Sequence, residues 1–157
     1  MRQVKLDKID RKILFHLQEN GRMTNVELAQ KAGISAPPCL RRVRALEEAG
    51  LVRGYHAVLD AQALGYGVTV FANVKLTSQA ESDLKQFETL IQSWPLVREC
   101  HMLAGETDFL LKIVARDWDD YQHFLTQKLT SAPNVTSVKS SLAIRRTKEE
   151  PGVPIEI

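Results

Sequence analysis

The stretch ECHMLAGETDFLLK (residues 99–112) combines residue types that could hold both charged ends of a free α-amino acid. Gly105 permits backbone conformations in which successive N–H groups converge on a carboxylate. Asp108 supplies a carboxylate that could bind an ammonium group. The alternative is a β-hairpin corner built from turn-favouring residues, and on these residues alone the corner is the interpretation to prefer.

A second stretch, GISAPPCLRRVRALEEAG (residues 33–50), predicts a helix that begins with prolines and carries arginines. Pro37 and Pro38 suit a first turn, where backbone N–H groups have no intrahelical partner. Ser35 then cannot cap the helix in the usual way, so its hydroxyl is either free for an outside partner or simply solvated. A helical projection places one set of residues inward, namely Leu40, Val43, Leu46 and Glu47. It places Pro38, Arg41, Arg42 and Ala45 outward, with Arg44 beside them.

The outward face of this helix is charged and has a small alanine at its centre, so it could approach a phosphate-lined groove closely. We expect the groove-facing residues to be Ser35, Pro38, Arg41, Arg42 and Arg44. Arg41 projects nearest the middle and is expected to contact a base, whereas Arg42 lies toward the edge and is expected to contact a phosphate. A surface helix with scattered arginines is the alternative.

Other constellations do not support catalysis or metal binding. Cys100 and His101 are adjacent in a predicted strand, so their side chains point to opposite faces. The four histidines show no metal-ligand spacing. No nucleophile elbow, P-loop or dinucleotide-binding glycine pattern occurs. An enzyme that uses the second half of the chain is therefore not expected, and neither a catalytic residue, a metal site nor a cofactor is predicted.

Three helices and a hairpin are predicted for the first half. Residues 7–20 show helical spacing of apolar residues, with Asp7 as N-cap and Gly21 where a left-handed residue would end the helix. Thr24 and Glu27 form a capping-box pattern at the start of a second helix. The third helix follows after the tight turn AGIS, which is the spacing of a helix-turn-helix. Residues 51–60 predict a small hairpin around Arg53 and Gly54, which would make this a winged variant.

The second half predicts the order βαββαβ, a ferredoxin-like arrangement. The expected strands are residues 68–77, 96–105, 109–115 and 135–148, and the expected helices are 81–94 and 117–129. The strand FLLKIVA (109–115) is apolar on both faces apart from Lys112. We expect Phe109, Leu111 and Ile113 to lie on an open sheet face that is buried against a second chain.

Composition and charge fit a protein that meets a polyanion through its first half. Residues 1–60 carry 11 Lys/Arg and 7 Asp/Glu, a net +4, whereas residues 61–157 carry 10 and 12, a net −2. Chance imbalance on a solvated surface is the alternative. No apolar run approaches the roughly 18 residues that cross a membrane, and no apolar leader segment is present. The two distant cysteines do not suggest a disulfide framework, so a reducing cytoplasm is expected.

The first half resembles the DNA-binding domain of the Lrp/AsnC (feast/famine) family of transcriptional regulators, leucine-responsive regulators in particular. The resemblance lies in the segments LDxIDxxILxxLQxxGR, TNVELA and PCLRRVRxLExxGLVxGY, which follow one another without gaps. The second half is similar to the effector-binding and oligomerisation domain of the same family. The resemblance thus predicts an α+β protein in which a winged helix-turn-helix domain (1–60), a linker (61–67) and a ferredoxin-like domain (68–148) precede a tail (149–157).

The resemblance implies a DNA-binding regulator whose assembly or operator binding is modulated by a small amino acid, namely leucine, methionine or one with a similar apolar side chain. The family's effector pocket lies between dimers, and the residues that match its positions are Met102, Ala104, Gly105, Glu106, Thr107, Asp108, Trp118, Ser141, Leu142 and Ala143. Trp118 is bulkier than the methionine-like residue often found there and Ser141 replaces an aromatic, so the pocket volume and the effector's identity stay open.

The implied partners are double-stranded DNA, a small-molecule amino acid and other copies of the chain, as a dimer that assembles to a tetramer, octamer or larger disc, with no membrane. The implied location is the bacterial cytoplasm, in association with the nucleoid. An architectural DNA-wrapping protein with little ligand response is the alternative function. For the tail EEPGVPIEI, a frayed end is preferred over a strand-like interaction segment.

Overall fold

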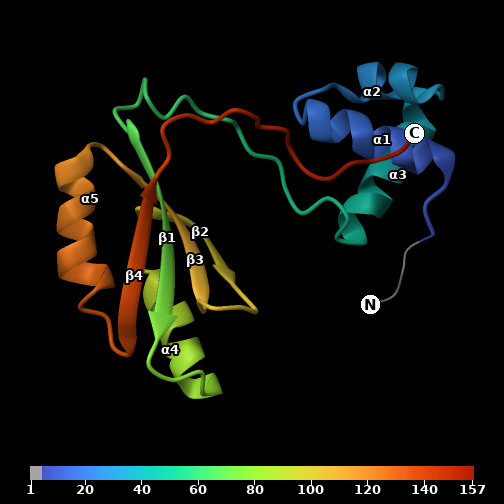
Figure 1. Cartoon of the computed structure of the whole chain (residues 1–157). Helices are drawn as coiled ribbons and strands as arrows, with labels where there is room; N and C mark the ends of the chain where they lie inside the picture. The colour runs from blue at the N-terminus through green and yellow to red at the C-terminus, as the bar shows by residue number, and fades with distance from the viewer. Residues whose placement is uncertain (1–4) are drawn as a thin grey trace. The chain divides into compact units, whose positions relative to one another are not determined.

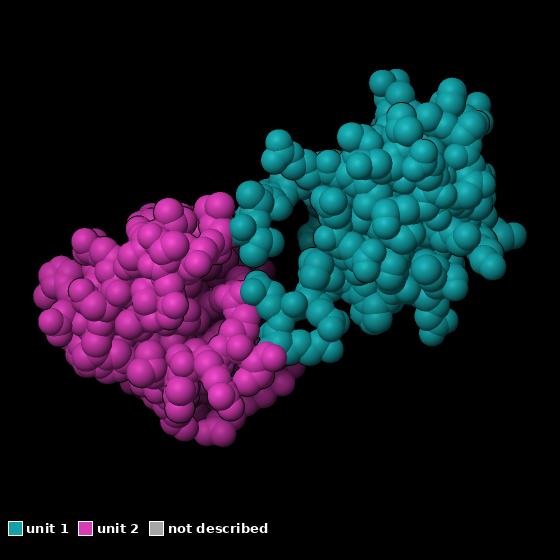
Figure 2. Space-filling view, turned by 90° about the horizontal axis from the view of Figure 1, so that it is seen from above, with its two compact units in different colours: residues 1–58, 148–157 teal, residues 59–147 magenta. Residues whose placement is uncertain are grey.

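The computed structural model describes residues 5–157 and divides the chain into two compact units (Figure 2). The first unit holds the residues up to Val58 together with Lys148–Ile157, and the second holds Leu59–Thr147. The tail therefore belongs to the first unit, although it follows the second in sequence. This assignment differs from the expected frayed end.

The first unit contains three helices, α1 (Lys8–Glu19), α2 (Asn25–Ala32) and α3 (Ala36–Glu48) (Figure 1). Both helix starts that we predicted from capping residues are confirmed. Asp7 accepts a hydrogen bond from the backbone N–H of Asp10, and Thr24 accepts one from that of Glu27 in a complete capping box. Gly33 ends α2 at φ +77°, in the left-handed region that glycine favours.

A compact apolar core joins the three helices. Its fully or nearly fully buried members come from all three, namely Ile13, Leu28, Ala29, Ala32, Cys39 and Leu46. Burial of such side chains contributes about 1.5–3 kcal/mol each for the larger ones, so this core is sufficient to fix α3 against α1 and α2. No residue of the tail belongs to this core.

Two expectations about this unit are wrong. Residues 51–60 contain no strand, so the predicted hairpin does not form and the segment has no regular secondary structure. Gly21 is not left-handed. A side chain there would instead meet the ring of Tyr55, since a Cβ would lie 3.0 Å from Tyr55 Cδ1. Tyr55 in turn donates a hydrogen bond from its hydroxyl to Glu47 Oε1 (2.7 Å), which holds this segment on α3 without strand pairing.

The second unit is a four-stranded antiparallel sheet with two helices on one face (Figure 1). Its elements are β1 (Val68–Leu76), α4 (Glu81–Ile91), β2 (Val97–Met102), β3 (Phe109–Ala115), α5 (Trp118–Phe124) with a π-helical extension (Leu125–Leu129), and β4 (Val135–Leu142). The spatial order is β2-β3-β1-β4. The predicted βαββαβ arrangement is confirmed, although β4 ends earlier than expected, at Leu142.

The assignment of sheet faces differs from our expectation for β3. Phe109, Leu111 and Ile113 are 0–1% exposed and pack with Phe87 of α4 and Tyr121 of α5 in the main core. The open face carries the alternate residues, among them Leu110, Lys112 and Val114 of β3. The strand is apolar on both sides, so its composition could not distinguish the covered face from the open one.

Candidate functional site

The start of α3 has the local structure that its prolines dictate. Ser35 is the N-cap residue, and its side chain makes no capping hydrogen bond, as predicted. Pro37 and Pro38 occupy the second and third helical positions, where they remove N–H groups that a capping hydroxyl would otherwise receive. The exposed Ser35 hydroxyl therefore stands at the beginning of the helix without an intrahelical role.

The faces of α3 differ from the projection by about one residue. Cys39 is fully buried, and burial raises the pKa of its thiol. Leu40, which we expected to face inward, is 40% exposed. The outward stripe consists of Pro37, Leu40, Arg41, Arg44, Ala45 and Glu48, whereas Pro38 is half-buried. Cysteine packs as a small apolar residue, and once it is counted so, positions 39, 43 and 46 form the inward stripe.

Arg42 points toward α1 rather than away from the unit. Its Nη1 lies 2.7 Å from Asp7 Oδ2 and 2.7 Å from Asp10 Oδ1. A hydrogen bond from the Asp10 backbone N–H and the Arg42 guanidinium both lower the pKa of Asp7. Arg42 thus fastens α3 to the start of α1, and this engagement argues against the phosphate contact that we expected from the helical projection.

Arg41 and Arg44 have the opposite character. Both are exposed, and neither forms an ion pair within residues 5–157. They lie three positions apart, so their side chains project from neighbouring points of the same helical face. An unpaired guanidinium can approach a phosphate or pair bidentately with guanine. This stripe is the part of the unit that is suited to a polyanion.

The loop between β2 and β3 is closed by a hydrogen bond from Leu103 N to Asp108 O (2.8 Å). Met102, Ala104, Gly105 and Glu106 are exposed, and Thr107 is half-buried. Gly105 does not have a positive φ, and no atom lies within 4 Å of a Cβ placed on it. The left-handed or crowded geometry that specifically requires glycine is therefore absent at this position.

Asp108 has a structural environment that the sequence did not suggest. The residue is 5% exposed. Its Oδ2 accepts a hydrogen bond from Leu76 N (2.7 Å) and its Oδ1 accepts one from Gln79 Nε2 (2.7 Å). The carboxylate therefore ties the start of β3 to the last residue of β1 and to the segment that follows it. This geometry argues against Asp108 as the group that binds an effector ammonium.

The remaining predicted effector residues cluster around the start of β1 and the end of β4. Trp118 is 44% exposed and its ring centroid lies 5.3 Å from that of Tyr121. Leu142 is 52% exposed and lies opposite Val70, on the covered side of the sheet. Ala143 donates its N–H to Thr69 O (2.9 Å). Ser141 lies opposite Phe71, on the open face, and so points away from Leu142.

The two groups of predicted effector residues do not meet within one chain. The loop 102–108 lies where β1 ends, because Phe109 pairs with Val74, whereas Trp118 follows Ala115, which pairs with Val68 at the other end (Figure 1). Val74 and Val70, the partner of Leu142, are four positions apart in β1, or roughly 13 Å at 3.3 Å per residue. A single effector molecule cannot touch both groups in one copy.

Three residues that sequence reasoning overlooked have clear roles here. Asp10 is a second carboxylate for Arg42, Gln79 is a donor to Asp108, and Asn25 donates from Nδ2 to Ala36 O (2.8 Å) between α2 and α3. The partners are separated by 32, 29 and 11 residues. Periodicity and capping rules describe neighbours in sequence, so they carried no signal for these contacts.

Within residues 5–157, no cluster of three or more His, Cys, Asp or Glu side chains is arranged to hold a metal ion. Within the same range, no helix has the length and apolar composition to cross a membrane.

Comparison with known proteins places these features in a family. Residues 69–153 match the model of the Lrp/AsnC ligand-binding domain, and residues 6–53 match that of a winged helix-turn-helix DNA-binding domain. The chain is 54% identical to the leucine-responsive regulatory protein of Rhizobium meliloti, covering 94% of each chain. It is 43% identical to the Bkd operon transcriptional regulator of Pseudomonas aeruginosa, covering 89% of this chain and 92% of the other.

A solved transcriptional regulator of Neisseria meningitidis, in complex with L-methionine, superposes with a TM-score of 0.91 at 39% identity, covering 96% of this chain and 97% of the other. The α+β architecture, the helix-turn-helix and ligand-binding matches and these relatives all indicate a transcriptional regulator and not an enzyme. The chain belongs to the Lrp/AsnC family of DNA-binding transcriptional regulators.

Proposed function

We propose that this regulator responds to an amino acid with an apolar side chain, leucine or methionine, which modulates its assembly or its operator binding. Two comparisons support the effector class, namely the relative called leucine-responsive and the structural neighbour solved with L-methionine. The exposed apolar side chains of Trp118 and Leu142 offer a suitable surface for such a side chain.

The effector site is completed by two copies of the chain. The observation that carries this proposal is the separation of the two predicted groups at opposite ends of one sheet. The exposed loop of one copy, residues 102–107, supplies backbone N–H groups, and a second copy supplies Trp118, Leu142 and Ala143. Asp108 acts as a positioning residue that holds the loop through Leu76 and Gln79. Ser141 lies at the border of the site, on the open face.

DNA contact is made by the outward stripe of α3. Arg41 contacts a base edge, Arg44 contacts a phosphate, and the free Ser35 hydroxyl lies at the helix start near the half-buried Pro38. Arg42 does not contact DNA in this proposal but holds α3 in place through its ion pairs with Asp7 and Asp10 at the start of α1. Because the protein binds operator DNA in this proposal, we expect it to be located in the bacterial cytoplasm, at the nucleoid.

Assembly begins with a dimer in which open sheet faces meet. The apolar side chains on that face are Phe71, Leu110 and Val114, and Phe71 is 38% exposed. An ion pair between Lys112 and Glu99 (2.5 Å) lies among them. Further association of dimers into a tetramer, octamer or larger disc brings the loop of one copy to the Trp118 region of another.

A thermal-shift measurement across the twenty amino acids tests the effector class. A ligand that binds only the folded state raises the free energy of unfolding by about 2.7 kcal/mol at a concentration one hundred times its Kd. We expect leucine or methionine to raise the melting temperature and glycine and aspartate to leave it unchanged. If none of the twenty raises it while DNA does, the chain is instead an architectural DNA-wrapping protein and the effector proposal fails.

A further inference from the structure

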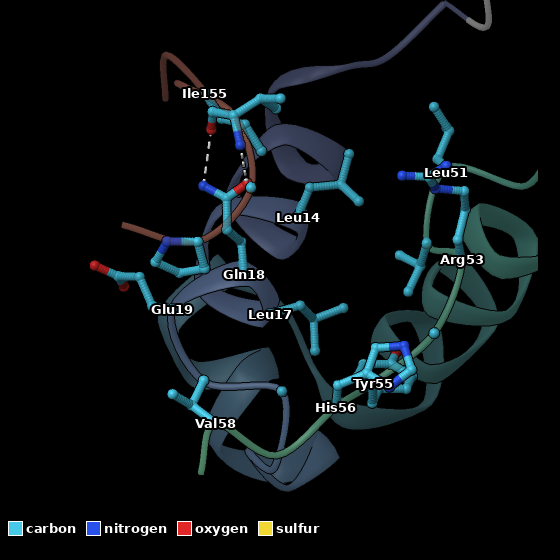
Figure 3. A pocket seen from close by; sticks show the side chains of 16 residues that line it. Leu14, Leu17, Gln18, Glu19, Leu51, Arg53, Tyr55, His56, Val58 and Ile155 are labelled. Carbon is cyan, nitrogen blue, oxygen red and sulfur yellow. Dashed lines mark hydrogen bonds between the residues drawn. The ribbon is translucent and has the colours of Figure 1, made fainter. Parts of the chain in front are cut away.

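The C-terminal tail is attached to α1 by a specific pair of hydrogen bonds. Gln18 Nε2 donates to Val153 O (2.8 Å), and Val153 N donates to Gln18 Oε1 (2.9 Å) (Figure 3). A side-chain amide thus satisfies both polar groups of one backbone residue, as a neighbouring strand would. The side chain of Val153 is 63% exposed, so the attachment depends on its backbone and not on its isopropyl group.

Gly152 is required for this approach. Its φ is +70°, and a Cβ at this position would lie 2.0 Å from Gln18 Oε1 and 2.5 Å from Gln18 Cδ. A side chain here would therefore strain the backbone and displace the amide at the same time. Pro151 and Pro154 flank the contact and restrict the backbone of the undocked tail, so less conformational entropy is lost on docking.

The docked tail forms one wall of a cavity of about 660 Å³ that has both apolar and polar lining residues (Figure 3). Leu14 and Leu17 of α1 contribute a second wall, and the segment that follows α3 contributes a third through Val52 and Tyr55. Ile155 lines the same cavity from the tail. The apolar core of the unit contains no tail residue, so the tail is an addition to a domain whose core is complete without it.

We propose that residues 151–155 are a docking segment for the Gln18 side of α1, and that docking gives the DNA-binding unit a second connection to the effector unit. The first connection passes through Val58 and Leu59, and the second through Thr147 and Lys148. Only five residues separate Leu142, the end of β4, from Lys148. If the proposed function holds, a displacement of β4 on effector binding reaches α1 through this segment.

Hydrogen exchange of the backbone amide at position 153 tests the docking itself, without DNA or effector. In the full-length wild-type chain we expect protection of this amide, because its N–H is hydrogen-bonded to Gln18 Oε1. Gln18→Ala and Gly152→Ala should each reduce the protection by more than about tenfold, because the tail leaves α1 more often once this hydrogen bond is lost. Val153→Ala is the matched control and should keep the protection. An unprotected amide in the wild-type chain, or protection that survives Gln18→Ala, would overturn the proposal.

A peptide experiment tests the binding site in trans. A chain that ends at Lys148 should bind a fluorescent peptide of residues 149–157, whereas the intact chain should bind it far less because its own tail competes. The same peptide carrying Gly152→Ala should not bind, and neither should the wild-type peptide bind the shortened chain carrying Gln18→Ala. Equal binding to the shortened chains with and without Gln18 would contradict the assigned site.

The coupling is measured as the fold-change in DNA affinity on adding L-leucine or L-methionine. We expect the Gly152→Ala variant still to bind both the amino acid and DNA. The effect of the amino acid on its DNA affinity should, however, be at least about fivefold smaller than in the Val153→Ala variant. If the amino acid changes the DNA affinity of Gly152→Ala as much as that of Val153→Ala, the docking segment has no role in coupling, whatever the hydrogen-exchange result. A wild-type chain that binds neither amino acid overturns the proposed function instead, and the exchange and peptide results then decide the docking segment alone.

Discussion

Arg41 and Arg42 are neighbours in sequence, yet their surroundings assign them different tasks. Arg42 is held between the carboxylates of Asp7 and Asp10, whereas Arg41 is exposed and unpaired within the described residues. A helical projection separates them by only about 100°, which is too little to distinguish a groove-facing arginine from one that contacts the next helix. The ion-pair partners make that distinction.

Alanine variants of the two arginines should therefore fail in different assays. Arg41→Ala should weaken operator binding by about 1–3 kcal/mol and relax the preference at one base position. Arg42→Ala should leave the selected consensus unchanged and lower the free energy of unfolding by about 1 kcal/mol or less, since the guanidinium is partly exposed. Operator selection from a random DNA pool and urea denaturation provide the two readouts. An unchanged consensus with Arg41→Ala would remove that residue from base contact.

Asp108→Asn tests whether this carboxylate has a structural role. Both of its oxygens accept from donors, Leu76 N and Gln79 Nε2, so an amide would turn its own NH₂ toward one of them. A buried donor left without an acceptor costs about 1–3 kcal/mol. Urea denaturation should show this loss, while Glu106→Gln, on the exposed part of the same loop, should match the wild type. Unchanged stability for Asp108→Asn would contradict the structural role and favour a direct contact between Asp108 and the effector.

At the scale of elements, what the sequence predicted well was local. Asp7 and Thr24 marked helix starts because a capping side chain bonds to a backbone N–H three residues away. Alternation gave β1, whose buried residues occupy every second position from Val70 to Leu76. It failed on β3, which is apolar on both sides. The hairpin failed as well, because β-favouring residues after Gly50 have no strand beside them in this unit.

The junction between β3 and α5 predicts a pH dependence. Arg116 holds Asp120 through both carboxylate oxygens, and its side-chain and backbone hydrogen bonds lower the pKa of Asp120 from 3.8 to about 2. A lowered folded-state pKa contributes stability that is fully present above the unfolded value and is lost as the pH falls from about 4 to about 2.

Asp120→Asn should consequently be less stable than the wild type at pH 6, and most of the difference should be lost as the pH falls to about 2. Unfolding midpoints in urea, measured between pH 2 and pH 7, provide the comparison. Asp119→Asn on the exposed side of α5 is the control and should follow the wild-type curve. A constant difference between Asp120→Asn and the wild type across this range would show that Asp120 does not carry the pH dependence.

At the scale of the whole molecule, the geometry of the proposed effector site could not have been predicted from the sequence alone. The family resemblance named the residues, but β-sheet register decides which of them share an end of the sheet. The contact between Gln18 and Val153 spans 135 residues and joins a helix to a tail that composition alone described as frayed. Such contacts depend on tertiary packing, for which no local pattern exists.

Sharing of the site between copies predicts complementation. Trp118→Ala and a loop variant, Gly105→Trp, should each abolish the thermal shift with the best amino acid. Mixing the two after joint refolding should restore part of it, because some sites then combine an intact loop with an intact Trp118. Light scattering should give at least a dimer for the wild type, well above 17.7 kDa. No restoration in mixed oligomers would place the site within one copy.

The central claim is that an amino acid and DNA affect each other's binding through this chain. Fluorescence anisotropy of a labelled duplex, obtained by selection with the full-length protein, measures its affinity with and without saturating L-leucine or L-methionine. We expect one of the two to change the DNA dissociation constant by about 5–150-fold, the usual range of allosteric coupling, and DNA to change the affinity for that amino acid by the same factor. A dissociation constant that stays unchanged, although calorimetry shows the amino acid bound, would contradict the account.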